Sequence, residues 1–264
     1  MLVLALDTTT RQGSVALARD AVLLGCEVGD DRLTHGERLP GDLIRLLERN
    51  NTRLSDIDLF AVAAGPGSFT GLRIGIATMQ GLALTNGRGL VGVSALDALN
   101  AAVRKRGPGS LFSEALGEKR DPGPLFQPGP FFVGALMDAQ RGEVFSALYC
   151  DDELIEGPSV EAPAGAVARW KNRGTESITL AGNGALTYRD LIARILPAAQ
   201  VVTDVPPLAP SIAMIAQQQA SGGARSPGAI RPIYVRRPDA ELARDRKGQV
   251  HGSGSVVQGS GPKV

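Results

Sequence analysis

Histidine and cysteine are scarce in this chain, which has two of each among 264 residues. Two cysteines are too few for a disulfide framework. Cys26 and Cys150 both lie in apolar, strand-like runs, so we interpret them as buried thiols of a reducing compartment, with redox chemistry as the alternative. With His35 and His251 as the only histidines, no Ser/His/Asp catalytic arrangement is indicated.

Strong net charge and long apolar segments are also missing. The formal net charge is +1, which argues against a protein whose own surface binds nucleic acid electrostatically. No uncharged apolar run reaches the roughly 18 residues of a membrane span, so no membrane association is expected. The apolar start, MLVLALD, has no basic segment before it, and we therefore predict a cytoplasmic protein without a signal peptide.

One pattern of elements occurs twice. LALDTTTRQGSVALA and GALMDAQRGEVFSALY each contain a strand that ends in aspartate, a short polar loop and a second strand. Asp7 and Asp138 stand at equivalent points, which favours two divergent copies of one βββαβα unit. Chance similarity of two hairpins is the alternative. The ranges expected as the strands of the two hairpins are 2–7, 14–18 and 21–28, then 131–138, 143–150 and 153–160.

The remaining elements alternate between strands and helices, as in an α/β protein. Residues 107–130 contain five prolines and five glycines without periodicity, which is typical of an inserted loop. From about Asp239 the sequence is charged and then rich in Gly and Ser, which indicates disorder. The predicted organisation is a first lobe at 1–106, the insert at 107–130, a second lobe at 131–237 and a disordered tail at 238–264. The expected helices are 38–51, 70–85, 94–103, 162–171, 185–195 and 210–220, and the further strands are 57–65, 90–93 and 177–182.

Limited proteolysis should cut this chain first within 107–130 or after Arg237. Proteases prefer exposed segments without packed structure, and both regions lack the hydrophobic periodicity of a folded element. Mass spectrometry of the early fragments would identify the sites. Early cleavage inside 60–90 would contradict the domain assignment.

The stretch AAGPGSFTGLRIG, residues 63–75, looks like a loop that holds phosphate, but it matches none of the motifs tested. It lacks the lysine of a P-loop, and its third glycine stands one place late for a dinucleotide fingerprint. A nucleophile elbow needs glycine two residues on either side of the serine, and neither is present. Because amides at a helix N-terminus attract anions, Gly67 and Ser68 remain weak candidates for cofactor contact, alongside Asp7. The alternatives are a tight turn capped by Ser68 or Thr70 and, at Asp7, a carboxylate that caps the end of its strand.

The helix expected over 70–85 has no charge from Ile74 to Gly87, so both of its sides should be covered. Small residues at Gly71 and Gly75 would let another helix come close, and we interpret this face as a docking surface for a partner chain. Burial by the chain's own helix over 38–51 is the alternative. The residues expected at the partner interface are His35, Leu39, Leu43, Leu46, Gly71, Leu72, Gly75, Ile76, Thr78, Met79 and Leu82.

Seven segments together resemble the TsaB family, also called YeaZ, of accessory proteins that help to make N6-threonylcarbamoyladenosine in tRNA. The resemblance covers roughly 1–106 and, more weakly, 131–237, and GPGSFTGLRIG is its most specific part. The segments are DTTTRQGSVAL, HGERL, GPGSFTGLRIGIATMQGLAL, GVSALDAL, DAQRGEVF, GNGA and PIYVR.

This resemblance implies the duplicated fold of actin, Hsp70 and sugar kinases, with two lobes that each contain a mixed sheet flanked by helices. It also implies a non-catalytic subunit that pairs with the catalytic paralogue TsaD, with the ATPase TsaE bound across the pair and tRNA contacted only through the complex. TsaD holds a metal with a His-x-x-x-His pair, whose most plausible counterparts here are Ala95 and Leu99. We therefore expect no metal and no cofactor. A homodimer in isolation is compatible with the sequence, and the alternative function is a metallopeptidase-like or nucleotide-hydrolysing enzyme of the same fold.

His35 is the best single candidate for chemistry in the sequence. It stands at the start of the helix expected over 38–51, where a side chain can cap exposed amides or contact a partner. We interpret it as a structural or interface residue, with acid–base catalysis as the alternative.

Overall fold

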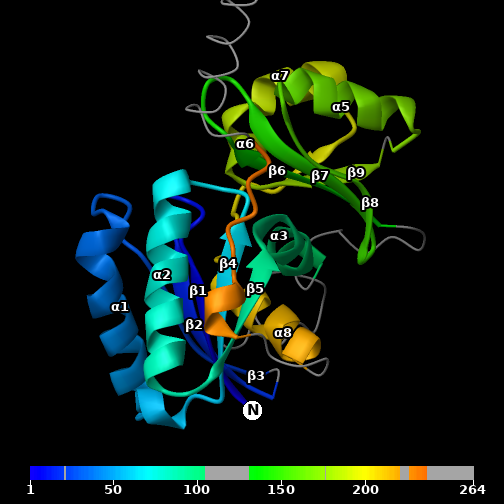
Figure 1. Ribbon diagram of the computed structural model, residues 1–264. Helices are drawn as coiled ribbons and strands as arrows, with labels where there is room; N and C mark the ends of the chain where they lie inside the picture. The colour runs from blue at the N-terminus through cyan, green and yellow to red at the C-terminus, as the bar shows by residue number, and fades with distance from the viewer. Residues whose placement is uncertain (21, 105–130, 176, 221–225, 237–264) are drawn as a thin grey trace, which may run out of the picture.

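The computed structural model describes residues 1–104 except Ala21, 131–175, 177–220 and 226–236. The insert expected at 107–130 and the tail expected at 238–264 lie outside the described residues. Two five-stranded sheets form the centres of two lobes (Figure 1). In order across the first sheet, the strands are β3 (Val22–Val28), β2 (Ser14–Arg19), β1 (Leu2–Asp7), β4 (Leu59–Gly65) and β5 (Gly89–Ser94). In order across the second, they are β8 (Glu153–Glu161), β7 (Val144–Cys150), β6 (Phe132–Asp138), β9 (Ile178–Ala181) and β10 (Gln200–Val201).

The two sheets have the same topology, which confirms the predicted duplication. In each sheet the first strand is central, pairs antiparallel with the second, and pairs parallel with the strand on its other side. The hairpins also agree in register, because Asp7 pairs with Ser14 and Asp138 pairs with Val144 at the closed ends. Both predicted aspartates therefore end a central strand at equivalent positions.

Helices cover both faces of each sheet. The first group, α1 (His35–Arg49) and α2 (Phe69–Thr85), packs on the outer face of the first sheet and buries one cluster of apolar side chains. Between the two sheets lies α3 (Ala95–Arg104), and α8 (Ala209–Ala220) packs beside it on the inner face of the first sheet. Both belong to a core that contains residues of both lobes. The outer face of the second sheet carries α5 (Pro163–Asn172), α6 (Asn183–Thr187) and α7 (Arg189–Ile195). The order of layers is therefore helix, sheet, helix, sheet, helix.

The first turn of α1 begins three residues earlier than the sequence periodicity indicates. Thr34 forms a capping box with Glu37: the Thr34 amide donates to the Glu37 carboxylate at 2.8 Å, and the Thr34 hydroxyl accepts from the Glu37 amide at 3.4 Å. This box satisfies amides that would otherwise have no partner at a helix start. It places His35 inside the helix rather than before it.

The position of α8 corrects the predicted boundary of the second lobe. The sequence places 210–220 in a lobe that spans 131–237, but α8 packs against β1, β2 and β4 of the first sheet and against α3. The short turn Pro227–Ala229 also packs against α2 and β5. The chain after β10 therefore returns to the first lobe, because the inner face of the first sheet needs an apolar cover that α3 alone does not provide.

Candidate functional site

The loop 8–13 joins β1 to β2, and Asp7 holds its first turn. The amide and the hydroxyl of Thr9 both donate to Asp7 Oδ1, at 2.8 and 2.6 Å. Asp7 is only 2% exposed. Burial raises the pKa of the Asp7 carboxyl above its usual value, while the two hydrogen bonds from Thr9 and the charge of Arg38 act in the opposite direction. This geometry is the capped turn that the sequence favours at Asp7.

The loop between β4 and α2 is packed against its neighbour. The Ser68 amide donates to the Thr9 carbonyl at 2.9 Å, and the Ser68 hydroxyl accepts from the Gly71 amide at 3.2 Å. A side chain at Gly67 would put a Cβ 2.5 Å from the Cβ of Thr9. The amides of Ser68 and Gly71, which were expected to face a phosphate, therefore bond within the chain. This is the capped turn that the sequence analysis gives as the alternative.

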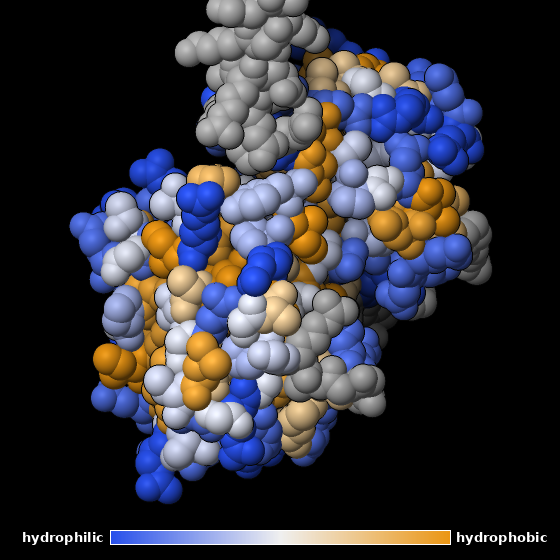
Figure 2. Space-filling view, in the orientation of Figure 1, coloured by the Kyte–Doolittle hydropathy of each residue, from blue (hydrophilic) through white to orange (hydrophobic). Residues whose placement is uncertain are grey.

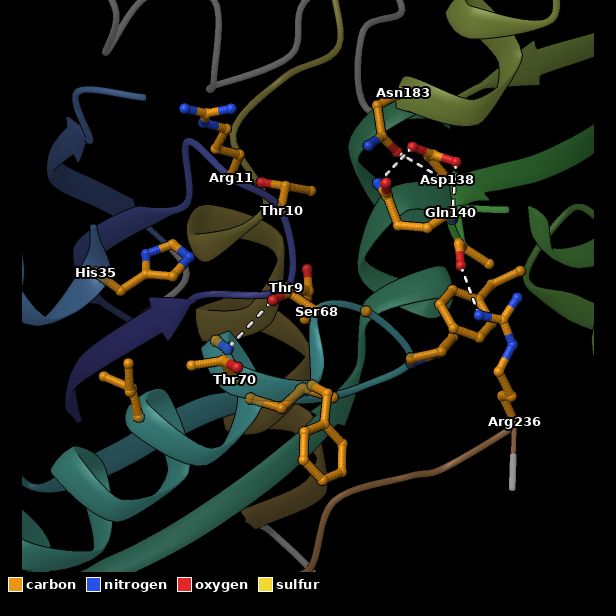
Figure 3. Close-up of a pocket in the computed structure, with 18 of the residues that line it drawn as sticks. Thr9, Thr10, Arg11, His35, Ser68, Thr70, Asp138, Gln140, Asn183 and Arg236 are labelled. Carbon is orange, nitrogen blue, oxygen red and sulfur yellow. Dashed lines mark hydrogen bonds between the residues drawn. The ribbon is translucent and has the colours of Figure 1, made fainter. Parts of the chain in front are cut away.

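The two equivalent hairpin loops face each other across a cleft of about 930 Å³ between the lobes (Figure 3). On the second side, the amide and side chain of Gln140 donate to the two carboxylate oxygens of Asp138 at 3.0 and 2.8 Å. The Asp138 amide donates to Asn183 Oδ1 at 3.0 Å. Each side of the cleft therefore has a turn that is held by the aspartate before it, Asp7 in the first lobe and Asp138 in the second.

Charged groups at this cleft are partly compensated. Four arginines and one aspartate line it. Of the arginines, Arg32 forms an ion pair with Asp30, and Arg236 forms one with Glu143. The cleft consequently offers a ligand less positive charge than its composition indicates.

The segment 230–236 connects the two lobes beside the cleft, and sequence reasoning did not assign it this role. The Ile233 amide donates to the Ala64 carbonyl at 2.6 Å in the first lobe. Arg236 donates to the Ala139 carbonyl at 2.8 Å in the second. PIYVR marks this segment in the sequence, but nothing local in that motif indicates which loops it will join.

A second depression, of about 360 Å³, lies between α1 and α2. We call it the α1–α2 groove. Ile44 is 55% exposed beside it, and hydrophobic side chains follow the seam between the two helices (Figure 2). The residues that line the groove are His35, Gly36, Leu39, Pro40, Leu43, Ile44, Leu47, Leu54, Ile74, Thr78 and Leu82.

The structure divides the predicted interface residues into two groups. His35, Leu39, Leu43, Thr78 and Leu82 line the α1–α2 groove. Of these, Leu39 and Leu43 are themselves buried, at 3% and 8% exposure. The others are buried within this chain and do not line the groove: Leu46, Gly71, Leu72, Gly75, Ile76 and Met79.

Gly71 and Gly75 require a correction, because this chain's own loop occupies the space that the sequence analysis assigns to a partner helix. A Cβ at Gly71 would lie 2.1 Å from the Thr8 carbonyl oxygen, and a Cβ at Gly75 would lie 2.2 Å from Thr8 Oγ1. The Thr8 hydroxyl also donates to the Gly71 carbonyl at 2.8 Å. The glycines do permit a close approach, but what approaches is Thr8 of the loop, with its backbone at Gly71 and with its side chain at Gly75.

The ring of His35 is held as a neutral imidazole. Arg38 donates from Nη2 to His35 Nδ1 at 2.8 Å, since a guanidinium has no acceptor. Burial, and then the charge of Arg38, lowers the pKa of His35, whereas a hydrogen bond with the Thr10 backbone and the charge of Asp42 raise it in part.

The pH dependence of stability should report this neutral ring. The pKa of His35 lies below its unfolded value of about 6.5, so its contribution to stability is present above about pH 6.5 and is lost as the pH falls through the folded pKa. We expect the stability of wild type relative to His35→Gln to decrease between about pH 7 and pH 5. Urea denaturation at several pH values measures this difference. A difference that does not change with pH would contradict the assigned state of the ring.

Among the described residues, no group of three or more His, Cys, Asp or Glu side chains is placed to hold a metal ion. No helix in the same ranges is long and apolar enough to cross a bilayer.

Comparisons with known proteins place these features in context. The profile of the family described as "TsaD: tRNA N6-adenosine threonylcarbamoyltransferase" matches residues 32–113. An uncharacterized protein of Mycobacterium tuberculosis is 32% identical over 241 residues, which cover 90% of this chain and 93% of that one. The tRNA threonylcarbamoyladenosine biosynthesis protein TsaB of Escherichia coli is 33% identical over 197 residues, which cover 72% of this chain and 75% of that one. The structure of YeaZ from Pseudomonas aeruginosa matches with a TM-score of 0.66 and 28% identity, covering 88% of this chain and 99% of that one.

Proposed function

The chain belongs to the TsaB (YeaZ) family, and on that premise we propose that it takes part in making N6-threonylcarbamoyladenosine in tRNA as a non-catalytic partner subunit. Its proposed partner is a TsaD-type catalytic paralogue, which transfers the threonylcarbamoyl group. A TsaE-type ATPase would bind across the pair, and tRNA would be contacted through the complex.

The observation that carries the proposal is the α1–α2 groove. It is lined almost entirely by apolar side chains, and Ile44 stands exposed beside it. Apolar surface of this kind gains free energy when a partner covers it. The TsaD profile spans 32–113 and so includes the segments that form α1 and α2 here. A TsaD-type protein would therefore present a related helix pair, and the two pairs could meet as a helical bundle.

Co-expression with the TsaD-type paralogue of the same genome tests this pairing directly. We expect the two chains to co-elute in size-exclusion chromatography, and we expect depletion of this chain to lower N6-threonylcarbamoyladenosine in cellular tRNA. A homodimer of the isolated chain that dissociates when the paralogue is added is compatible with the proposal. Failure of the chains to associate at micromolar concentration would contradict it.

The alternative is an enzyme of the same fold. The cleft between the lobes, at about 930 Å³, is large enough for a nucleotide, and this favours nucleotide hydrolysis over peptidase activity as the second candidate. Metal analysis and an ATP hydrolysis assay on the pure chain distinguish the functions. A stoichiometric transition metal or steady turnover of ATP would overturn the non-catalytic proposal.

A further inference from the structure

The His35 ring lies where three elements meet. It projects from the first residue of α1. A Cβ at Gly13 in the loop would be 3.2 Å from His35 Cε1, and a Cβ at Gly71 in α2 would be 3.3 Å from Cδ2 and Nε2. The imidazole therefore fills the space between the loop 8–13 and the first turn of α2 (Figure 3).

Both groove helices hold this loop. On the α2 side, the Thr8 hydroxyl donates to the Gly71 carbonyl in the helix. The amide of Ser68, in the turn before α2, donates to the Thr9 carbonyl. These bonds fix the start of 8–13.

From α1, Arg38 donates to the Gln12 carbonyl and to His35 Nδ1, so one guanidinium joins the loop to the His35 ring. Arg38 is itself fixed by a buried ion pair with Asp42 at 2.5 Å. The second half of the loop is therefore positioned by α1, and its conformation depends on where the first turn of that helix lies.

His35 also belongs to both depressions of the molecule. It lines the α1–α2 groove on one side and the cleft between the lobes on the other. We propose that His35 couples the two: a partner's apolar helix seated in the groove restrains the imidazole and, through it, the loop 8–13 at the edge of the cleft.

This inference goes beyond the proposed function and rests on it only for the identity of the partner helix. Since coupling between two sites is reciprocal, whatever orders the loop should also strengthen docking in the groove. His35 acts here as a positioning residue, through its packing against Gly13 and its hydrogen bond with Arg38, which itself bonds the Gln12 carbonyl.

Hydrogen exchange followed by mass spectrometry tests the coupling. In wild type, binding of the TsaD-type paralogue should slow amide exchange in 8–13 about fivefold or more, the lower end of typical coupling between sites. In His35→Ala the partner should still protect α1 and α2, but the added protection of 8–13 should be lost. His35→Gln keeps a polar side chain of similar length that can accept from Arg38, and it should restore part of this protection. Thr78→Ala is the matched control, because Thr78 lines the same groove from a position later in α2 than Gly71.

Each outcome decides the inference. In the free chain, His35→Ala should already speed amide hydrogen exchange in 8–13, whereas Thr78→Ala should not. Equal exchange rates in wild type and His35→Ala would overturn the coupling, even if no partner bound. If the partner protects α1 and α2 but leaves 8–13 unchanged in wild type, the coupling is wrong and the proposed function stands. If the partner protects neither helix, the proposed docking fails, and the free-chain comparison still tests the contact through His35.

Discussion

Replacing Gly71 with alanine should destabilise the folded chain by about 2 kcal/mol or more. The new Cβ would lie 2.1 Å from the carbonyl oxygen of Thr8, and a backbone atom in that position cannot rotate away. The loop cannot retreat without losing the hydrogen bond from the Thr8 hydroxyl to Gly71 and straining the turn that Asp7 caps. Alanine gains about 1 kcal/mol of helix propensity over glycine, which offsets only part of the overlap. Thermal denaturation should show a fall in Tm of about 4 to 8 °C.

Gly81→Ala is the matched control on the same helix. A Cβ at Gly81 meets nothing within 4 Å, so only the helix propensity changes. This variant should be more stable than wild type by up to about 1 kcal/mol. If both substitutions stabilise the chain equally, the close approach of Thr8 to Gly71 does not exist in solution.

The duplicated sheets could be predicted from sequence because their signal is local. Each hairpin is encoded within about twenty residues by alternating apolar positions and a polar turn, and Asp7 and Asp138 mark the same point in both copies. The α1–α2 groove is formed partly by residues whose spacing is also local. Leucines at helical spacing, such as Leu39 and Leu43, indicate a face of α1, and Thr78 and Leu82 indicate a face of α2.

What the sequence could not provide was the identity of distant neighbours. Glycines at 71 and 75 correctly indicate a close approach, but a glycine does not say which segment comes near. The periodicity of α8 shows that it is buried without showing on which sheet it packs. The segment that ends at Arg236 bonds Ala139 across the cleft, and a contact over nearly one hundred residues leaves no trace in local spacing.

Ile44→Arg should abolish stable association with the TsaD-type paralogue and leave the fold intact. Ile44 is 55% exposed in the free chain, so it contributes little to the core, and arginine is a good helix former. In the complex, however, the guanidinium would have to be buried against an apolar helix face without a partner charge. We expect a loss of affinity of about 30-fold or more, as when a central interface residue is removed. Calorimetric titration against the paralogue measures it, and circular dichroism checks the fold.

Leu154→Arg provides the control with the same chemistry on another surface. Leu154 is 44% exposed on β8, and β8 is an edge strand of the second sheet, whereas α1 packs on the first. The Leu154→Arg variant should bind the paralogue with the affinity of wild type. If Ile44→Arg binds the paralogue normally and Leu154→Arg does not, the docking surface lies on the second lobe rather than in the α1–α2 groove. If both variants bind like wild type, neither surface is the interface, and apolar exposure beside α1 has another cause. Only the selective loss at Ile44 supports a partner helix seated in the groove, since general effects of added positive charge would act on both variants alike.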